Sequence, residues 1–84
     1  MLDCLITFRS VLPAQRAETL LRKHGISCAV RRTPKWLEVQ GCGYSLRLHS
    51  SRLREALVYL EEKQIAYRKL YKQGEDGKAV EVEL

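Results

Sequence analysis

The sequence lacks several features that would point directly to a protein class. No run of about 18 apolar residues is present, so no helix is expected to cross a membrane. The three cysteines contain no CxxC pair, which argues against a zinc site and a disulfide framework. The acidic residues and two histidines show no paired acid–base arrangement, and we expect no metal or other cofactor.

The N-terminus also lacks the basic region and small-residue cleavage site of a signal peptide. An odd number of cysteines without a pairing pattern fits a reducing compartment better than an oxidising one. These two absences together predict a cytoplasmic protein.

The composition predicts one small folded domain with a basic body. The chain has 84 residues and is 45% hydrophobic, which argues against disorder. Residues 1–72 hold 14 Lys and Arg against 6 Asp and Glu, a net charge of +8, whereas residues 73–84 carry −3. We therefore expect a domain over residues 1–72 and a C-terminal hairpin strand or tail over residues 73–84. The basic body fits anionic partners or simply a solvated surface.

Hydrophobic periodicity predicts four strands and two helices. The strands are expected at residues 4–10, 26–32, 44–50 and 65–72. One helix begins at a Ser10 cap, tolerates Pro13 in its first turn and ends at Gly25. The other helix is expected to be capped by Ser50 or Ser51. The closing stretch "AVEVEL" alternates and is interpreted either as an extra edge strand or as a mobile tail.

This order of elements predicts an α+β, ferredoxin-like βαββαβ sandwich. Right-handed crossovers make the first and third strands antiparallel neighbours and place the second strand outside the third. Both helices then cover one face of an antiparallel sheet. Residues 44–50 should alternate between a buried face and a polar face.

The stretch "QGCGYSLR" places Cys42 between Gly41 and Gly43, directly before the third strand. In the predicted topology this position lies at the end of the sheet where the first strand ends and the first helix begins. Cys42 should then lie close to Phe8, Arg9 and Ser10 after the first strand, and close to Arg31, Arg32 and Thr33 at the end of the second strand. Arginines and unpaired helix amides lower the pKa of a thiol, and glycines let backbone amides approach the sulfur.

The residue chemistry leaves two interpretations of Cys42 open. In one, the loop presents a thiolate; in the other, glycine makes the turn and the cysteine fills a small gap beside Trp36 or Tyr44. The remaining cysteines, Cys4 and Cys28, lie in apolar runs and are expected to behave as small buried hydrophobic residues.

Five segments together resemble a bacterial domain family described as putative selenium/sulfur carrier protein-like: "LITF", "AETLLRKHGI", "RRTP", "GCGYSLRL" and "YRKLY". The resemblance covers most of residues 4 to 71. Its most specific part is "GCGYSLR" with the upstream "RTP". The reactive cysteine-glycine pair of that family is matched here by Cys42 and Gly43.

This resemblance implies a carrier that holds sulfur or selenium on a cysteine as Cys–S–S⁻ or Cys–S–Se⁻. Such a carrier needs donor and acceptor proteins as partners and requires no metal. Arg9, Arg32 and the amides of the first helix are candidates for stabilising the terminal anion. Arg47 and Lys35 are candidates for steering partner proteins to the site.

Other functions remain open at this point. A non-catalytic interaction or small-molecule-sensing module, including a homodimer, is the main alternative. RNA binding is disfavoured because no RNP-like pattern is present, although Tyr67 and Tyr71 are expected to share one face of the fourth strand. A conventional enzyme is the least favoured interpretation.

Overall fold

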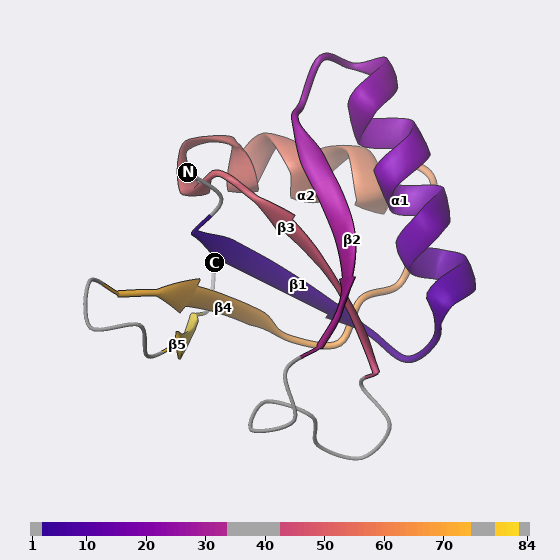
Figure 1. Cartoon of the computed structure of the whole chain (residues 1–84). Helices are drawn as coiled ribbons and strands as arrows, with labels where there is room; N and C mark the ends of the chain where they lie inside the picture. The colour runs from indigo at the N-terminus through magenta and orange to yellow at the C-terminus, as the bar shows by residue number, and fades with distance from the viewer. Residues whose placement is uncertain (1–2, 34–42, 75–78, 83–84) are drawn as a thin grey trace.

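The fold is an antiparallel sheet with two helices (Figure 1). The computed structural model describes residues 3–33, 43–74 and 79–82. Its elements, in chain order, are β1 (Cys4–Phe8), α1 (Val11–Lys23), β2 (Cys28–Arg32), β3 (Tyr44–Leu48), the 3-10 turn η1 (Ser50–Arg52), α2 (Leu53–Glu62), β4 (Leu70–Gln73) and β5 (Ala79–Val82). The strand order β2-β3-β1-β4-β5 contains the predicted ferredoxin-like arrangement. The fold class is therefore confirmed, and "AVEVEL" contributes a fifth strand.

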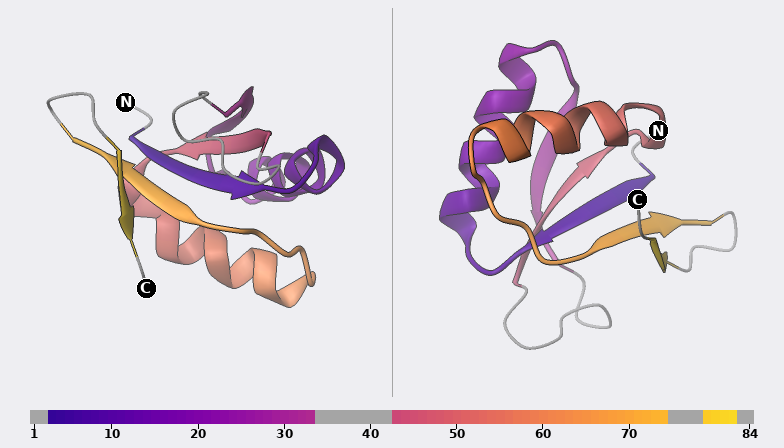
Figure 2. Two further views of the ribbon diagram at one scale, coloured as in Figure 1. Left: turned by 90° about the horizontal axis from the view of Figure 1, so that it is seen from below. Right: turned by 180° about the vertical axis from the view of Figure 1, so that it is seen from behind.

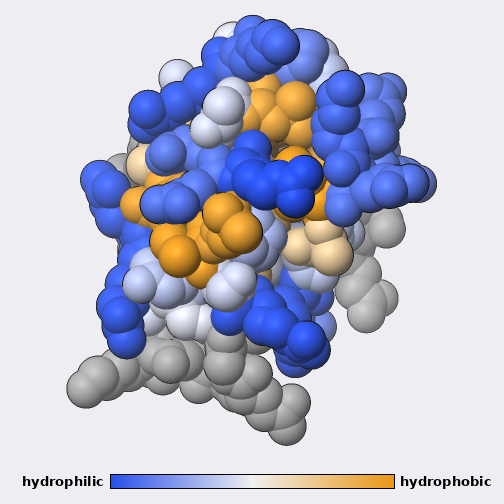
Figure 3. Space-filling model, turned by 90° about the vertical axis from the view of Figure 1, so that its right-hand side faces the viewer, coloured by the Kyte–Doolittle hydropathy of each residue, from blue (hydrophilic) through white to orange (hydrophobic). Residues whose placement is uncertain are grey.

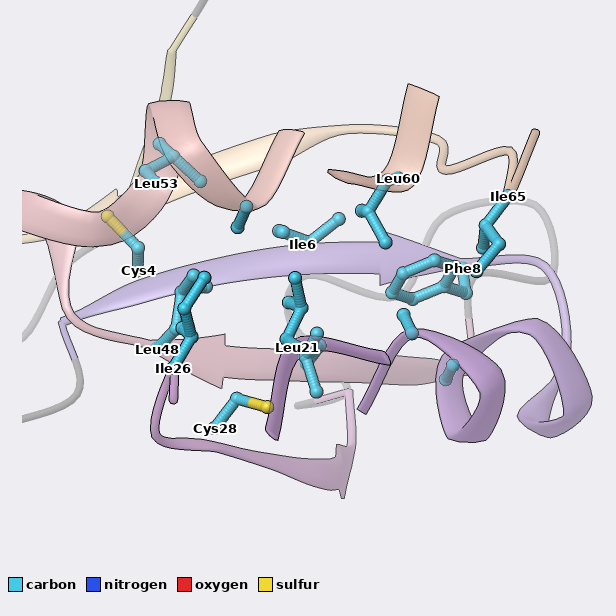
Figure 4. Packing of buried hydrophobic residues seen from close by; sticks show 14 of the residues in the cluster. Cys4, Ile6, Phe8, Leu21, Ile26, Cys28, Leu48, Leu53, Leu60 and Ile65 are labelled. Atoms are coloured by element: carbon cyan, nitrogen blue, oxygen red, sulfur yellow. The ribbon is translucent and has the colours of Figure 1, made fainter. Parts of the chain in front are cut away.

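The main core lies between the sheet and both helices, which cover the same face (Figure 2). Alternate residues of β1, namely Cys4, Ile6 and Phe8, are fully buried on this face. Ile6 and Phe8 point into the layer that also holds Leu21 of α1 and Leu60 of α2 (Figure 4). The hydrophobic spacing of the sequence thus places each helix on the sheet as predicted.

Helix α1 begins and ends where the sequence indicates. Ser10 occupies the N-cap position, although its side chain makes no cap hydrogen bond, and Pro13 lies in the first turn. At the other end, Gly25 has a φ of 77°. The Gly25 amide donates to the Arg22 carbonyl and the Ile26 amide to the Leu21 carbonyl, at 3.0 and 2.9 Å. This is a Schellman ending, in which glycine adopts the left-handed conformation without steric cost.

The prediction that Ser50 or Ser51 caps the second helix is wrong. These serines belong to the turn η1, and α2 begins only at Leu53. Their amides are donors, not capping groups: Ser50 N donates to Asp3 Oδ1 at 2.8 Å, and Ser51 N donates to His49 Nδ1 at 3.1 Å. The acceptor for Ser50 comes from the far end of the sequence, where no local motif points to it.

Strand β4 begins at Leu70, five residues later than Ile65, because the chain is bulged before it. The Arg68 amide donates to the Thr7 carbonyl at 2.8 Å, while the Thr7 amide donates to the Lys69 carbonyl at 2.9 Å. Two residues of this segment therefore lie opposite one residue of β1, as in a β-bulge. The Thr7 hydroxyl also accepts a hydrogen bond from the Lys69 amide at 3.0 Å.

The bulge overturns the prediction that Tyr67 and Tyr71 share one face, because an extra residue reverses the alternation of side chains. Tyr67 lines cavities beside α1 and α2. Tyr71 instead packs against Leu5 and Ala79 on the second face of the sheet, away from the helices. The paired aromatic surface considered for RNA binding is therefore not formed by these two residues.

The second face of the sheet is more buried than its sequence suggests. Ser45, predicted on the polar side of β3, has no exposed surface, and Thr7 opposite it is also buried. The Ser45 hydroxyl lies 3.4 Å from the Arg31 carbonyl, which accepts its hydrogen bond. The alternation in residues 44–48 correctly predicts which face of the sheet each side chain points to. It does not predict that the side chains on the second face are buried.

Candidate functional site

Three strand ends meet at the edge of the sheet where the sequence places the site. Tyr44, the first residue of β3, pairs with Phe8 at the end of β1 and with Arg32 at the end of β2. The Thr33 amide then donates to the Gly43 carbonyl at 2.9 Å. This hydrogen bond joins the two described residues that flank the segment 34–42 (Figure 1). We call this edge the loop end of the sheet.

Several predicted site residues lie at the loop end. Arg9, Ser10 and Arg32 are exposed, and the Arg32 guanidinium lies 5.8 Å from the centre of the Tyr44 ring. Thr33 is 2% exposed, and its hydroxyl is buried without a hydrogen-bond partner in the described part of the chain. Cys42 and Gly41 fall in residues 34–42, outside the described residues, so their role stays a prediction.

The backbone conformation of Gly43 does not require glycine, whereas the expected approach of its amide to the Cys42 sulfur stays a prediction, because Cys42 lies outside the described residues. The φ of Gly43 lies outside the left-handed region, since Gly25 is the glycine with a positive φ among the residues described. A Cβ atom built on Gly43 would meet no described atom within 4 Å. Among the described residues, the contact that Gly43 makes at the loop end is through its carbonyl, which accepts a hydrogen bond from the Thr33 amide.

Arg47 does not lie at the loop end. It occupies the middle of β3, between Leu5 and Ala29 on the neighbouring strands. Arg47 lies four positions after Gly43, which corresponds to about 13 Å along an extended strand. Its Nε atom is buried and lacks a partner among residues 3–33, 43–74 and 79–82. The structure therefore brings Arg9, Ser10, Arg32 and Thr33 together with Gly43, but leaves Arg47 apart.

The two described cysteines are core residues, as expected. Cys4 is fully buried and Cys28 is 4% exposed. Burial raises the pKa of the Cys4 thiol, and the charge of Asp3 raises it further. Burial also raises the pKa of Cys28, although Arg22 beside it acts in the opposite direction. Both thiols stay protonated at neutral pH and are poor nucleophiles.

Two arginines near the loop end were missed by sequence reasoning. Arg16 of α1 and Arg68 of the bulge line one cavity together with Arg9 and Ser10. The sequence pattern predicts a regular strand over residues 65–72, which includes Arg68, and it indicates no role in a site for Arg16. Arg9 precedes the cap of α1 and Arg16 lies within the helix, so both are close to its start, but the position of Arg68 depends on the bulge, which has no local sequence signal.

The described residues contain no candidate metal centre. Among residues 3–33, 43–74 and 79–82, no three His, Cys, Asp or Glu side chains form a group that could hold a metal ion. In the same residues, neither α1 nor α2 is long and apolar enough to span a bilayer.

Comparison with known proteins identifies one family. The model of a family described as "putative Se/S carrier protein-like" matches residues 3–72, which is most of the chain. The match includes β1 to β3, both helices, all but the last residue of β4, and position 42. No curated protein and no solved structure matches the chain.

Proposed function

The chain belongs to the Se/S carrier protein-like family, and on that premise we propose that it carries sulfur or selenium on Cys42. The observation that supports this assignment best is the state of the other two cysteines. Cys4 and Cys28 are buried in the core with raised pKa values, so neither suits group transfer. Cys42 is the remaining cysteine, and it lies within the matched residues.

In the proposed reaction, the Cys42 thiolate attacks the terminal sulfur of a donor persulfide, R–S–SH. The S–S bond of the donor breaks, R–S⁻ leaves, and Cys42–S–SH forms, so a neutral sulfur atom is transferred without net oxidation. Loss of the persulfide proton to solvent gives Cys42–S–S⁻. An acceptor nucleophile then attacks the terminal sulfur and releases the Cys42 thiolate. A donor selenopersulfide, R–S–SeH, reacts in the same way to give Cys42–S–Se⁻.

Cations at the loop end support this chemistry. Arg9 and Arg32 are exposed there, and neither forms an ion pair with an acidic side chain in the described ranges. A terminal persulfide anion is stabilised by nearby guanidinium groups and by the unpaired amides at a helix start. In this proposal, donor and acceptor proteins dock at the loop end.

The test is intact-mass analysis of the full chain after incubation with a cysteine desulfurase and cysteine. We expect a mass gain of one sulfur atom that is lost in Cys42→Ser. The matched controls Cys4→Ala and Cys28→Ala should retain the adduct, provided that circular dichroism shows them folded. A parallel incubation with the desulfurase and selenocysteine, which supplies the donor selenopersulfide R–S–SeH, distinguishes selenium loading from sulfur loading.

Absence of any adduct on the wild-type chain would contradict the carrier function. An adduct that persists in Cys42→Ser would contradict the assignment of the site while leaving sulfur transfer in place. Native-state alkylation gives an independent check, because Cys42 should react with iodoacetamide before the two core cysteines do.

A further inference from the structure

Two adjoining cavities form a groove along α1. The first has a volume of about 440 Å³ and lies between the start of α1 and residues 64–68. The second has a volume of about 430 Å³ and continues along α1 toward Lys23 and Lys63. The two cavities share the lining residues Arg16 and Ile65, so they adjoin each other. We call them together the α1 groove.

All charged side chains that line the α1 groove are basic, and no described Asp or Glu lines it. The five basic residues are Arg9, Arg16, Lys23, Lys63 and Arg68. None of the five forms an ion pair or a side-chain hydrogen bond with another described residue. Basic side chains that share a cavity without an acidic partner repel one another, and an anion in the groove relieves that repulsion.

The arginines gather in the first cavity, around the start of α1. Arg9, Arg16 and Arg68 line it together with Ser10, whose side chain makes no cap hydrogen bond. The first turn of α1 also lacks an acidic residue that would neutralise its amides. Guanidinium groups bind phosphate through paired N–H donors, so three of them favour a dianionic phosphate over a single carboxylate.

The same cavity also has apolar walls. Ile65, Ala66 and Tyr67 line it, and Tyr67 is 40% exposed. On the side of the molecule formed by α1, hydrophilic side chains surround apolar patches (Figure 3). A ligand here therefore meets guanidinium groups and an aromatic ring within one cavity, whose size is typical of small-molecule sites.

We propose that the α1 groove binds a phosphorylated small molecule with an aromatic part. The phosphate lies among Arg9, Arg16 and Arg68, and the aromatic part packs against Ile65 and Tyr67. The proposal concerns a second site and does not depend on the carrier function. Loading of Cys42 is measured by mass, whereas occupancy of the groove is measured by titration. One proposal can therefore be contradicted while the other is supported.

The experiment is a titration of the full ¹⁵N-labelled chain with adenosine 5′-monophosphate, adenosine or inorganic phosphate at constant ionic strength. We expect the nucleotide to bind at least tenfold more tightly than either adenosine or phosphate alone. The largest amide shifts should fall in residues 9–16 and 64–68. Added salt should weaken binding, because the contacts are between charged groups.

Two variants of exposed residues test the groove directly. Arg16→Gln and Arg68→Gln should each weaken nucleotide binding about tenfold, the effect of losing one charge-assisted contact. Arg31→Gln removes the same charge from β2, outside the described cavities, and should leave the affinity within twofold. Thermal unfolding of each variant shows whether it is folded.

Four results of the titrations with the nucleotide, its parts and the variants would overturn the proposal. They are the absence of saturable binding, equal binding of adenosine and the nucleotide, equal binding of inorganic phosphate and the nucleotide, and equal loss of affinity in Arg31→Gln. A single-stranded oligoribonucleotide that binds the groove more than tenfold more tightly than the mononucleotide would also overturn it, in favour of a nucleic-acid site.

Discussion

At the scale of single residues, one carboxylate connects the start of β1 to the turn before α2. Asp3 accepts a hydrogen bond from the Ser50 amide at 2.8 Å. Burial acts to raise the pKa of Asp3. The hydrogen bonds from Ser50 outweigh this effect, with a smaller contribution from the charge of His49, so the pKa of Asp3 is lowered below its ordinary value of 3.8. The folded protein therefore favours the ionised form of Asp3 more than the unfolded chain does.

We predict that Asp3→Asn lowers the free energy of unfolding at pH 7 by about 0.5–1 kcal/mol, as for the loss of a helix cap. Because the folded pKa of Asp3 is depressed, its contribution is present above pH 3.8 and disappears as the pH falls through the folded value. Urea denaturation of both proteins from pH 7 to acid pH should show the difference shrinking.

The matched control for this prediction is Glu55→Gln. Glu55 forms an exposed ion pair with Arg52 at 3.0 Å, so its loss should change stability by less than about 0.5 kcal/mol. A difference between wild type and Asp3→Asn that stayed constant down to acid pH would contradict the role assigned to the charge.

Residue-level expectations from the sequence succeeded where the environment is local. Cys4 and Cys28 lie in apolar runs and are buried, as predicted. The full burial of Ser45 was not predictable, because it depends on Thr7 and Arg31 on the neighbouring strands. The cap formed by Asp3 was missed for the same reason, since 47 residues separate the acceptor from its donor.

At the scale of elements, both helices end in the same way but with different residues. Helix α2 is followed by Gln64 with a φ of 56°. The Gln64 amide donates to the Glu61 carbonyl and the Ile65 amide to the Leu60 carbonyl, at 3.1 and 2.9 Å. This repeats the ending of α1, where the equivalent residue is Gly25. A residue with a Cβ atom pays about 1–2 kcal/mol for this conformation.

We predict that Gln64→Gly raises the free energy of unfolding by about 0.5–1 kcal/mol, because relief of the strain exceeds the added entropy of the unfolded chain. The expected rise in melting temperature is about 2–8 °C. Gln64→Ala is the control: it removes the same side chain but keeps the strain, so it should not stabilise. A lower melting temperature for Gln64→Gly would mean that the contacts of the glutamine side chain outweigh the strain.

The sequence predicted the order of four strands and two helices because each has its own hydrophobic period, but it left open whether residues 79–84 add a strand and did not predict η1. Ala14, Ala17 and Leu21 mark the buried side of α1, and Leu46 and Leu48 that of β3. The start of β4 was placed too early because the bulge opposite Thr7 exists only in the paired sheet. The faces of Tyr67 and Tyr71, and the place of Arg68 in the α1 groove, follow from that bulge.

At the scale of the whole molecule, the loop end and the α1 groove are adjacent because both include the start of α1. Arg9 and Ser10 line the first cavity of the groove. Because they come directly after β1, they also lie beside the end of β2 and the start of β3. The topology predicted the gathering of Arg9, Ser10, Arg32 and Thr33. Whether Cys42 joins them is tested by the sulfur-loading experiment, since its position lies outside the described residues.

The outermost strand gives a final prediction about the domain boundary. Strand β5 pairs with β4, its Val82 packs against the main core, and its Ala79 packs against Leu5 and Tyr71. The family match ends at residue 72, and both of these β5 side chains are only partly buried. We therefore expect residues 1–72 to hold the essential core.

Deletion of residues 75–84 should lower the free energy of unfolding by about 1–3 kcal/mol, corresponding to the partial burial of two small apolar side chains and part of a strand ladder. Unfolding in urea should remain cooperative, because the main core lies between β1–β4 and both helices. Glu81→Gln is the control for the loss of the exposed Lys69–Glu81 ion pair, and should cost less than about 1 kcal/mol. A truncated chain that unfolds without cooperativity would make β5 part of the domain, because Leu5 and Tyr71 would then depend on it for their burial.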